Sequence, residues 1–267
     1  MRGFSVVSIH LFVILLSLLF VIPSVGAEEA IEHYQLGQSY YEEDRLEEAL
    51  SELEEAIELE PKNGEFYFLL GQIRAAMGNH ERGVEAYEKA VKFEKKRADF
   101  HLALGDAYFR VGKYKKAIKP FKKAIKRDRS LARAYMSLGQ TYFVLRDFGK
   151  AMKEMKKAIE MDAGNADWYR FLGSAYFATR RYDEAIGEYR HALDVDPQLA
   201  EAHMLIGRAY FEKGEYEKAV NEYKRAIETD PDDPLAHYHL SQAYKRMGMF
   251  EEAEKEDQLR RRSMRRD

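Results

Sequence analysis

The sequence contains no cysteine, and its 267 residues include only 6 Pro and 1 Trp. The absence of cysteine excludes disulfides, thiolate zinc sites, iron–sulfur clusters, a cysteine nucleophile and a lipid-modified cysteine anchor. So few prolines, with 17 Gly, argue against a loop-rich or low-complexity chain. A formal net charge of −3 does not favour binding to nucleic acid. With 46% hydrophobic residues, the chain can bury a core.

The only long hydrophobic run lies at the N-terminus, over residues 11–22. It follows the positive Arg2 and ends at Pro23, and the small residues Val25 and Ala27 stand where a signal peptidase requires them. We therefore predict a signal peptide over residues 1–27, cleaved after Ala27. The alternative is an uncleaved membrane anchor over residues 4–22, since about 20 residues span a bilayer. Either reading predicts an exported chain, periplasmic or secreted, or held at the inner membrane by that anchor.

From residue 30 onward the sequence repeats every 34 residues without insertion or deletion. The seven units are 30–63, 64–97, 98–131, 132–165, 166–199, 200–233 and 234–267. Counting positions within a unit, position 8 is Gly in six units and Ser241 in the last. Position 11 is Tyr in six units, and positions 20 and 27 are mostly Ala. Such strict spacing indicates an array of one structural unit.

Each unit reads as two amphipathic helices joined by a turn. In the third unit, Leu104, Tyr108 and Val111 fall on one helical stripe, and Gly112 marks the turn. We expect the small residues at positions 8 and 20 to let two helix backbones approach closely. One helix pair has too little apolar surface to fold alone, so the pairs must stack. The second helix of the last unit is polar, with residues such as Asp257, which suits a terminal cap.

This pattern resembles the tetratricopeptide repeat (TPR) family, and the resemblance covers residues 30–267. It implies an all-α fold, a right-handed α-solenoid of about seven helix–turn–helix repeats within residues 28–267. It also implies that positions 2, 5, 9, 12 and 13 line a concave, partner-binding groove. The groove residues expected on this basis are Tyr34, Tyr41, Phe68, Gln72, Leu102, Phe109, Met136, Gln140, Phe143, Arg170, Phe177, Met204, Arg208, Phe211 and Tyr238.

Two observations limit what can be expected of this groove as a binding site. Aromatic side chains at positions 5 and 12 can instead be ordinary residues of the family that pack on their neighbours. The basic clamp by which some TPR proteins grip a chaperone's C-terminal carboxylate is missing, because position 5 holds no Lys and position 9 no Asn.

The sequence shows no constellation typical of catalysis. It has no phosphate-binding loop, nucleotide fingerprint or nucleophile elbow, and four of its 8 His recur at position 4, which favours packing over metal binding. We therefore predict no catalytic, cofactor-binding or metal-binding residues, and hence no enzyme.

Charge is distributed unevenly between the units. Residues 30–63 hold 11 Asp or Glu and 2 Lys or Arg, whereas residues 98–131 hold 3 and 10. Six lysines of the second helix in that unit form a basic patch expected on the convex side: Lys115, Lys116, Lys119, Lys122, Lys123 and Lys126. The patch is either an ordinary solvated face or a site for an anionic partner or membrane surface.

Together these features predict an exported, non-enzymatic scaffold or adaptor that binds a partner peptide or protein in its groove. Envelope assembly or secretion is the expected setting. The alternative is an envelope protein that handles an anionic glycan or takes part in polysaccharide export, because aromatic and basic surfaces suit anionic sugars.

Overall fold

The computed structural model describes residues 25–264, in two compact units that comprise residues 25–100 and 101–264. Residues 1–24, which carry most of the predicted signal peptide or anchor, lie outside the described part. Val25 and Ala27, next to the predicted cleavage position, belong to the first described helix. Between residues 25 and 264, no helix is sufficiently long and apolar to traverse a bilayer.

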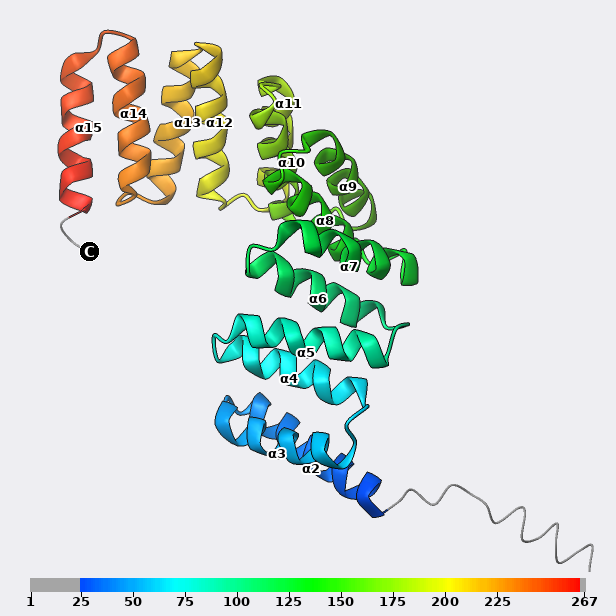
Figure 1. The fold of residues 1–267 in the computed structure, drawn as a ribbon. Coiled ribbons are helices and arrows are strands. Elements are labelled where there is room, and N and C mark those ends of the chain that lie inside the picture. The colour runs from blue at the N-terminus through cyan, green and yellow to red at the C-terminus, as the bar shows by residue number, and fades with distance from the viewer. Residues whose placement is uncertain (1–24, 265–267) are drawn as a thin grey trace, which may run out of the picture. The chain divides into compact units, whose positions relative to one another are not determined.

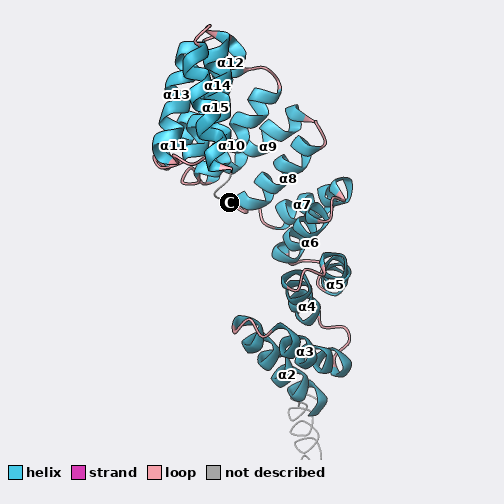
Figure 2. Cartoon of the chain, turned by 90° about the vertical axis from the view of Figure 1, so that its left-hand side faces the viewer, coloured by secondary structure: helices cyan, strands magenta, loops and turns pink. Residues whose placement is uncertain are grey.

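The described chain consists of fourteen helices and contains no strand (Figures 1 and 2). The first unit contains α2 (Val25–Glu42), α3 (Leu46–Leu59), α4 (Gly64–Ala76) and α5 (His80–Phe93). Helix α6 (Ala98–Arg110) begins in the first unit and continues into the second. The second unit continues with α7 (Tyr114–Arg127), α8 (Ala132–Val144), α9 (Phe148–Met161), α10 (Ala166–Ala178), α11 (Tyr182–Val195), α12 (Ala200–Lys213), α13 (Tyr216–Thr229), α14 (Pro234–Arg246) and α15 (Phe250–Ser263).

Consecutive helices form hairpins, two helices to each 34-residue unit of the sequence. From the second sequence unit onward, the first helix begins at the first residue of the unit, as at Gly64 and Ala132. The predicted all-α class and the tandem helix pairs are therefore confirmed.

Every hairpin turns at position 15 through a residue with positive φ. Gly112 and Gly214 adopt φ values of 71° and 79°, which glycine tolerates because it has no Cβ. Three hairpins turn instead through a residue with a side chain, and these are Asp44, Arg146 and Arg180, with φ between 60° and 62°. The turn geometry is thus fixed by the repeat, even where the residue is poorly suited to it.

The glycines at position 8 leave room mainly for a side chain of the second helix. A Cβ on Gly173 would lie 2.5 Å from the ring of Tyr189, and one on Gly207 would lie 2.6 Å from the ring of Tyr223. At Gly139 the predicted backbone approach is present, because a Cβ there would lie 3.1 Å from the carbonyl oxygen of Ala151. The small residue therefore admits an aromatic ring in most hairpins and a close backbone in fewer.

Histidines at position 4 join the two helices of their hairpins. The Nδ1 atom of His33 lies 2.7 Å from Glu52 Oε2, and that of His237 lies 2.6 Å from Glu256 Oε2. The pair formed by His203 and Glu222 has the same geometry at 2.8 Å. These histidines pack and bond within the fold, and the described residues contain no group of metal-ligating side chains.

Helix α15 has the polar character expected of a terminal element. Only Ala253 and Ser263 are buried along it, whereas Leu259 is 40% exposed. Its Asp257 forms an ion pair with Lys245 of α14 at 2.8 Å, where earlier hairpins place an apolar side chain such as Tyr223.

Candidate peptide-binding groove

The first helices of three successive hairpins in the second compact unit line an open pocket of about 590 Å³. Helix α6 contributes Asp106, Phe109 and Arg110, and helix α8 contributes Arg133, Met136, Ser137 and Gln140. The N-cap residue of α10, Asn165, and the only tryptophan of the chain, Trp168, complete the wall. The pocket thus combines apolar, amide and charged groups.

One carboxylate in this pocket, that of Asp106, is partly buried. An Nη2 atom of Arg133 donates a hydrogen bond to Asp106 Oδ2 at 3.0 Å. Burial raises the pKa of Asp106, although Arg133, Ser137 and Arg110 all favour its ionised form. Since Arg110 and Arg133 both line the pocket, one acidic residue faces two basic ones, and the pocket carries a net positive charge.

Two side-chain amides in the pocket are available to a ligand. Within residues 25–264, the amide groups of Gln140 and Asn165 have no hydrogen-bond partner, although both side chains are half-buried. Each amide can donate two hydrogen bonds and accept two. These groups can therefore bind the main chain of a peptide, which presents a donor and an acceptor at nearly every residue.

The first helices α6, α8, α10 and α12 also carry aromatic residues at position 12. The ring of each packs against an aromatic residue at the start of the second helix of the same hairpin. The ring of Phe109 meets the ring of Tyr114 at 5.1 Å between centroids, and Phe143 meets Phe148 at 5.5 Å. Phe177 and Phe211 make the same contact with the first aromatic residue of α11 and α13. All four phenylalanines are half-buried, so packing fixes the ring while part of it stays accessible.

Of the groove residues predicted in the second unit, Phe109, Met136 and Gln140 come together at this pocket. Burial leaves Met136 only 3% exposed and Met204 only 6%, so both offer little surface to a partner. Leu102 and Phe143 are half-buried, whereas Tyr238 is exposed.

The predicted arginines differ in what they contact. Arg170 is bound to Asp167 and Glu201 at 2.8 and 3.3 Å, and its side chain is only 19% exposed. Arg208 is exposed and lies over the ring of Phe177 at 5.3 Å.

In the first compact unit, two of the predicted groove residues pack against other aromatic rings of the fold. Tyr34 stacks on Phe66 at 5.0 Å, and Phe68 stacks on Phe100 at 4.4 Å. Tyr41 and Gln72 are half-buried. Aromatic residues at positions 5 and 12 therefore do pack on neighbours here, as the alternative reading expects.

Six pocket residues were not among the predicted groove residues: Asp106, Arg110, Arg133, Ser137, Asn165 and Trp168. Arg133 and Arg110 stand at positions 2 and 13, which the family resemblance already assigns to the groove. Asn165 and Trp168 lie at the junction of two units, where that assignment gives no signal.

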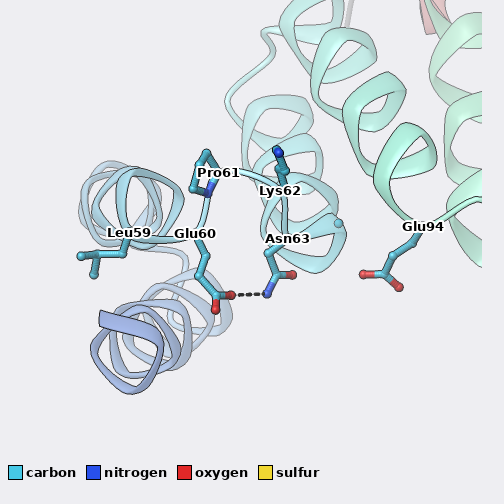
Figure 3. A pocket seen from close by; sticks show the side chains of 7 residues that line it. Leu59, Glu60, Pro61, Lys62, Asn63 and Glu94 are labelled. Atoms are coloured by element: carbon cyan, nitrogen blue, oxygen red, sulfur yellow. Dashed lines mark hydrogen bonds between the residues drawn. The ribbon is translucent and has the colours of Figure 1, made fainter. Parts of the chain in front are cut away.

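A second cavity, of about 680 Å³, lies in the first unit beside the loop between α3 and α4 (Figure 3). Its polar groups are used by the loop itself. The Asn63 amide donates to Glu60 at 3.0 Å and its oxygen accepts from the amide of Glu65, which caps α4. The Glu94 side chain closes against Gly64, where a Cβ would lie 2.8 Å from it. The cavity is thus a structural feature of this loop.

Family models match most of the chain. The model described as TPR repeat matches residues 37–78, 71–112, 105–145, 173–213 and 207–248, and that described as tetratricopeptide repeat matches residues 132–165. No curated protein matches the sequence.

Solved structures of TPR proteins resemble the chain. A crystal structure of MamA is 28% identical with a TM-score of 0.58, over 61% of this chain and 95% of its own. YrrB, described as a TPR protein with an unusual peptide-binding site, is 24% identical with a TM-score of 0.59, over 69% and 95%. The pilF protein of Pseudomonas aeruginosa is 18% identical with a TM-score of 0.64, over 78% and 95%. The last two likenesses show the fold.

TPR proteins are interaction scaffolds and in general are not enzymes, and neither the family models nor the solved structures indicate an enzyme family. The 34-residue period, the paired helices and the family models agree over residues 37–248 with one short gap. The chain belongs to the tetratricopeptide repeat family.

Proposed function

We propose that residues 101–267 bind an extended peptide segment of a partner protein in the pocket formed by α6, α8 and α10. The observation that carries this proposal is the presence of two unpartnered amides, Gln140 and Asn165, beside the aromatic walls Phe109 and Trp168. The amides suit the peptide main chain, and the rings suit an apolar side chain. Aromatic residues commonly supply the strongest contacts of such interfaces.

Under this proposal the chain is a non-enzymatic scaffold, and the half-exposed rings of Phe143, Phe177 and Phe211 extend the binding surface along α8, α10 and α12. The net positive charge of the pocket favours a segment that carries a carboxylate near its apolar anchor.

The test is selection of peptides from a random display library on the purified chain. Recovered peptides are then titrated against the double variant Phe109→Ala, Gln140→Ala. We expect the variant to bind more weakly by about 2 kcal/mol or more, since it loses one aromatic contact and one amide. A control is Phe250→Ala, a 70% exposed aromatic of α15 outside the pocket, which should leave the affinity unchanged. Equal affinity of the double variant and the unaltered chain would place the site elsewhere.

We further propose that the chain acts outside the cytoplasm, in envelope assembly or secretion. The support is the sequence of residues 1–27, with its apolar run and the small residues Val25 and Ala27. N-terminal sequencing of exported protein should begin at Glu28. Recovery of Met1 on a product that sediments with membranes would show the anchor over residues 4–22 instead. Failure of export would reject this location without bearing on the peptide pocket.

The alternative ligand is an anionic glycan. Arg110 and Arg133 beside Trp168 would suit an acidic sugar, because aromatic rings stack on sugar faces and guanidinium groups pair with carboxylates. Displacement of a selected peptide by an acidic polysaccharide, reversed by salt, would favour this alternative. Lack of displacement would favour the peptide.

A further inference from the structure

Helix α7 presents a surface of one charge sign. Its fourteen residues contain no Asp or Glu, and its six lysines are all exposed: Lys115, Lys116, Lys119, Lys122, Lys123 and Lys126. The opposite side of the helix is buried through Ala117, Pro120, Phe121 and Ala124. Of the other second helices, α3 carries acidic residues alone, and the rest carry both signs; α13, for example, includes Glu217 and Glu222 besides its basic residues.

No carboxylate neutralises these six lysines within the described chain. Two of them contact aromatic rings: Lys116 lies 5.9 Å from the centroid of Tyr108, and Lys122 lies 5.9 Å from that of Tyr142. Two acidic residues of the next hairpin are engaged with lysines of that hairpin, since Glu154 pairs with Lys157 at 3.1 Å and Asp147 pairs with Lys150 at 2.6 Å. The ring contacts orient single amines and leave the charge of the helix uncompensated.

The basic surface continues from α7 onto α9. The ring of Tyr142, on α8 between these helices, lies 5.9 Å from the amine of Lys122 and 5.4 Å from that of Lys150. Two amines from different helices therefore converge on one ring. Lys153 and Lys156 are exposed further along α9, and together with the six lysines of α7 they form what we call the α7–α9 basic face.

The chemistry of this face distinguishes among anionic partners. It contains lysines and no exposed aromatic residue, because Phe121 is fully buried and Tyr114 packs against Phe109. Cores of protein interfaces are enriched in aromatic residues and Arg and depleted in Lys. Lysine amines are flexible point charges without the planar, bidentate geometry of Arg. Such point charges are sufficient to bind a surface of mobile phosphate groups, which has no fixed geometry to match.

We propose that the α7–α9 basic face docks on the phosphate-rich surface of an anionic lipid bilayer. This interaction is separate from peptide binding, since the face consists of second helices and the pocket of first helices. Each lysine held near an anionic membrane favours the bound state by about fivefold, and several acting together produce firm but salt-sensitive docking.

The first test is lysine acylation read out by mass spectrometry on the full chain. The chain is mixed with vesicles of phosphatidylglycerol and phosphatidylcholine in equal parts, or of phosphatidylcholine alone. Because each lysine is measured separately, insertion of the apolar N-terminal run into either vesicle does not affect the comparison. Exposed lysines outside α7 and α9 serve as internal controls: Lys62, Lys96, Lys224 and Lys255.

We expect the lysines of α7 and α9 to be protected on anionic vesicles alone, with the protection lost at about 1 M salt, where the Debye length falls to about 3 Å. The four control lysines should react equally on both vesicles. Protection that is equal on the two vesicle types, or that extends to the controls, would overturn the proposal.

The second test compares two variants with the same change in net charge. One replaces Lys115, Lys119, Lys122 and Lys126 with Gln, and the other replaces Lys62, Lys96, Lys224 and Lys255 with Gln. We expect the first variant to lose anionic-vesicle affinity by at least about tenfold and the second to keep it. Equal losses would show that net charge and not the face is responsible. Binding to an acidic protein or polysaccharide, with no vesicle binding, would also overturn the proposal.

Discussion

The guanidinium of Arg74 on α4 forms an ion pair with the carboxylate of Glu54 on α3, at 3.2 Å, across the junction of the first two hairpins. These residues stand at position 11 of one unit and position 25 of the unit before it. At the junctions from the third unit to the seventh, the same positions hold Tyr and a basic residue, whereas the second unit has Glu88 at position 25 and the third has Tyr108 at position 11. Lys156 lies 5.4 Å from the ring centroid of Tyr176, and Arg190 donates to the hydroxyl of Tyr210 at 2.8 Å. At the first junction Arg therefore stands in place of Tyr, and its partner at position 25 is an acid.

This relationship predicts that the two positions are energetically coupled. Glu54→Lys alone should lower the free energy of unfolding of the first compact unit by about 0.5–1 kcal/mol, because it places a second positive charge beside Arg74. Adding Arg74→Tyr should recover most of the loss by restoring the arrangement of the later junctions. A double-mutant cycle from denaturant unfolding measures the coupling. Strictly additive effects would contradict it.

The hairpin turns predict a stabilising substitution. Arg180 is exposed and adopts φ of 60°, which costs energy for any residue with a Cβ. Arg180→Gly should therefore raise the free energy of unfolding by about 0.5–1 kcal/mol. Gly214→Ala, at the equivalent turn with φ of 79°, should lower it by a similar amount. Thermal unfolding of both variants checks the opposite signs, and a shift in the same direction would refute this account of the turn.

Two glycines of one hairpin should respond oppositely to alanine. A Cβ on Gly173 would lie 2.5 Å from the ring of Tyr189, which is 1% exposed and has no space to move, so Gly173→Ala should cost about 1–3 kcal/mol. No atom lies within 4 Å of a Cβ on Gly187, in α11, so Gly187→Ala should gain about 0.5–1 kcal/mol. Hydrogen exchange should locate the loss in α10 and α11 and their neighbours. A loss spread evenly over the chain would argue against nearest-neighbour coupling.

The first hairpin should lose stability as the pH rises. The hydrogen bond to Glu52 raises the pKa of His33 above its ordinary value of 6.5, although burial opposes this. The stabilisation by charged His33 is therefore complete below pH 6.5 and is lost as the pH rises through the folded-state pKa. His33→Gln should destabilise α2 and α3 more at about pH 5.5 than at about pH 8.5. An equal effect at both pH values would show that the pair contributes no charge-dependent stability.

Much of the fold follows from the 34-residue period, because Gly, Tyr and Ala at fixed positions determine which helix faces can meet. The period does not show that position 25 of one unit meets position 11 of the next, so the contact of Lys122 with Tyr142 appears only in three dimensions. Their outward positions suggest that the repeat places no constraint on the lysines of α7. The contact of Lys122 with Tyr142 shows that it constrains at least this one.

The candidate site could be predicted in part. Repeat position correctly brings Phe109 and Gln140 together, since the first helices of successive hairpins lie side by side. Position alone does not decide burial: Met204 turns into the core, whereas Tyr238, at the same position, is exposed. Trp168 stands at position 3 of its unit, which the family resemblance does not assign to the groove, so only the folded chain places it in the pocket.

The central claim is that a peptide occupies the pocket of α6, α8 and α10, and Trp168 permits a direct measurement because it is the only tryptophan. A peptide selected on the purified chain is titrated while tryptophan emission and heat are recorded. The account predicts that emission shifts to shorter wavelength and saturates with the same affinity as the heat, and that Gln140→Ala weakens both equally. Binding heat without any change in the emission of Trp168, unaffected by Gln140→Ala, would contradict it.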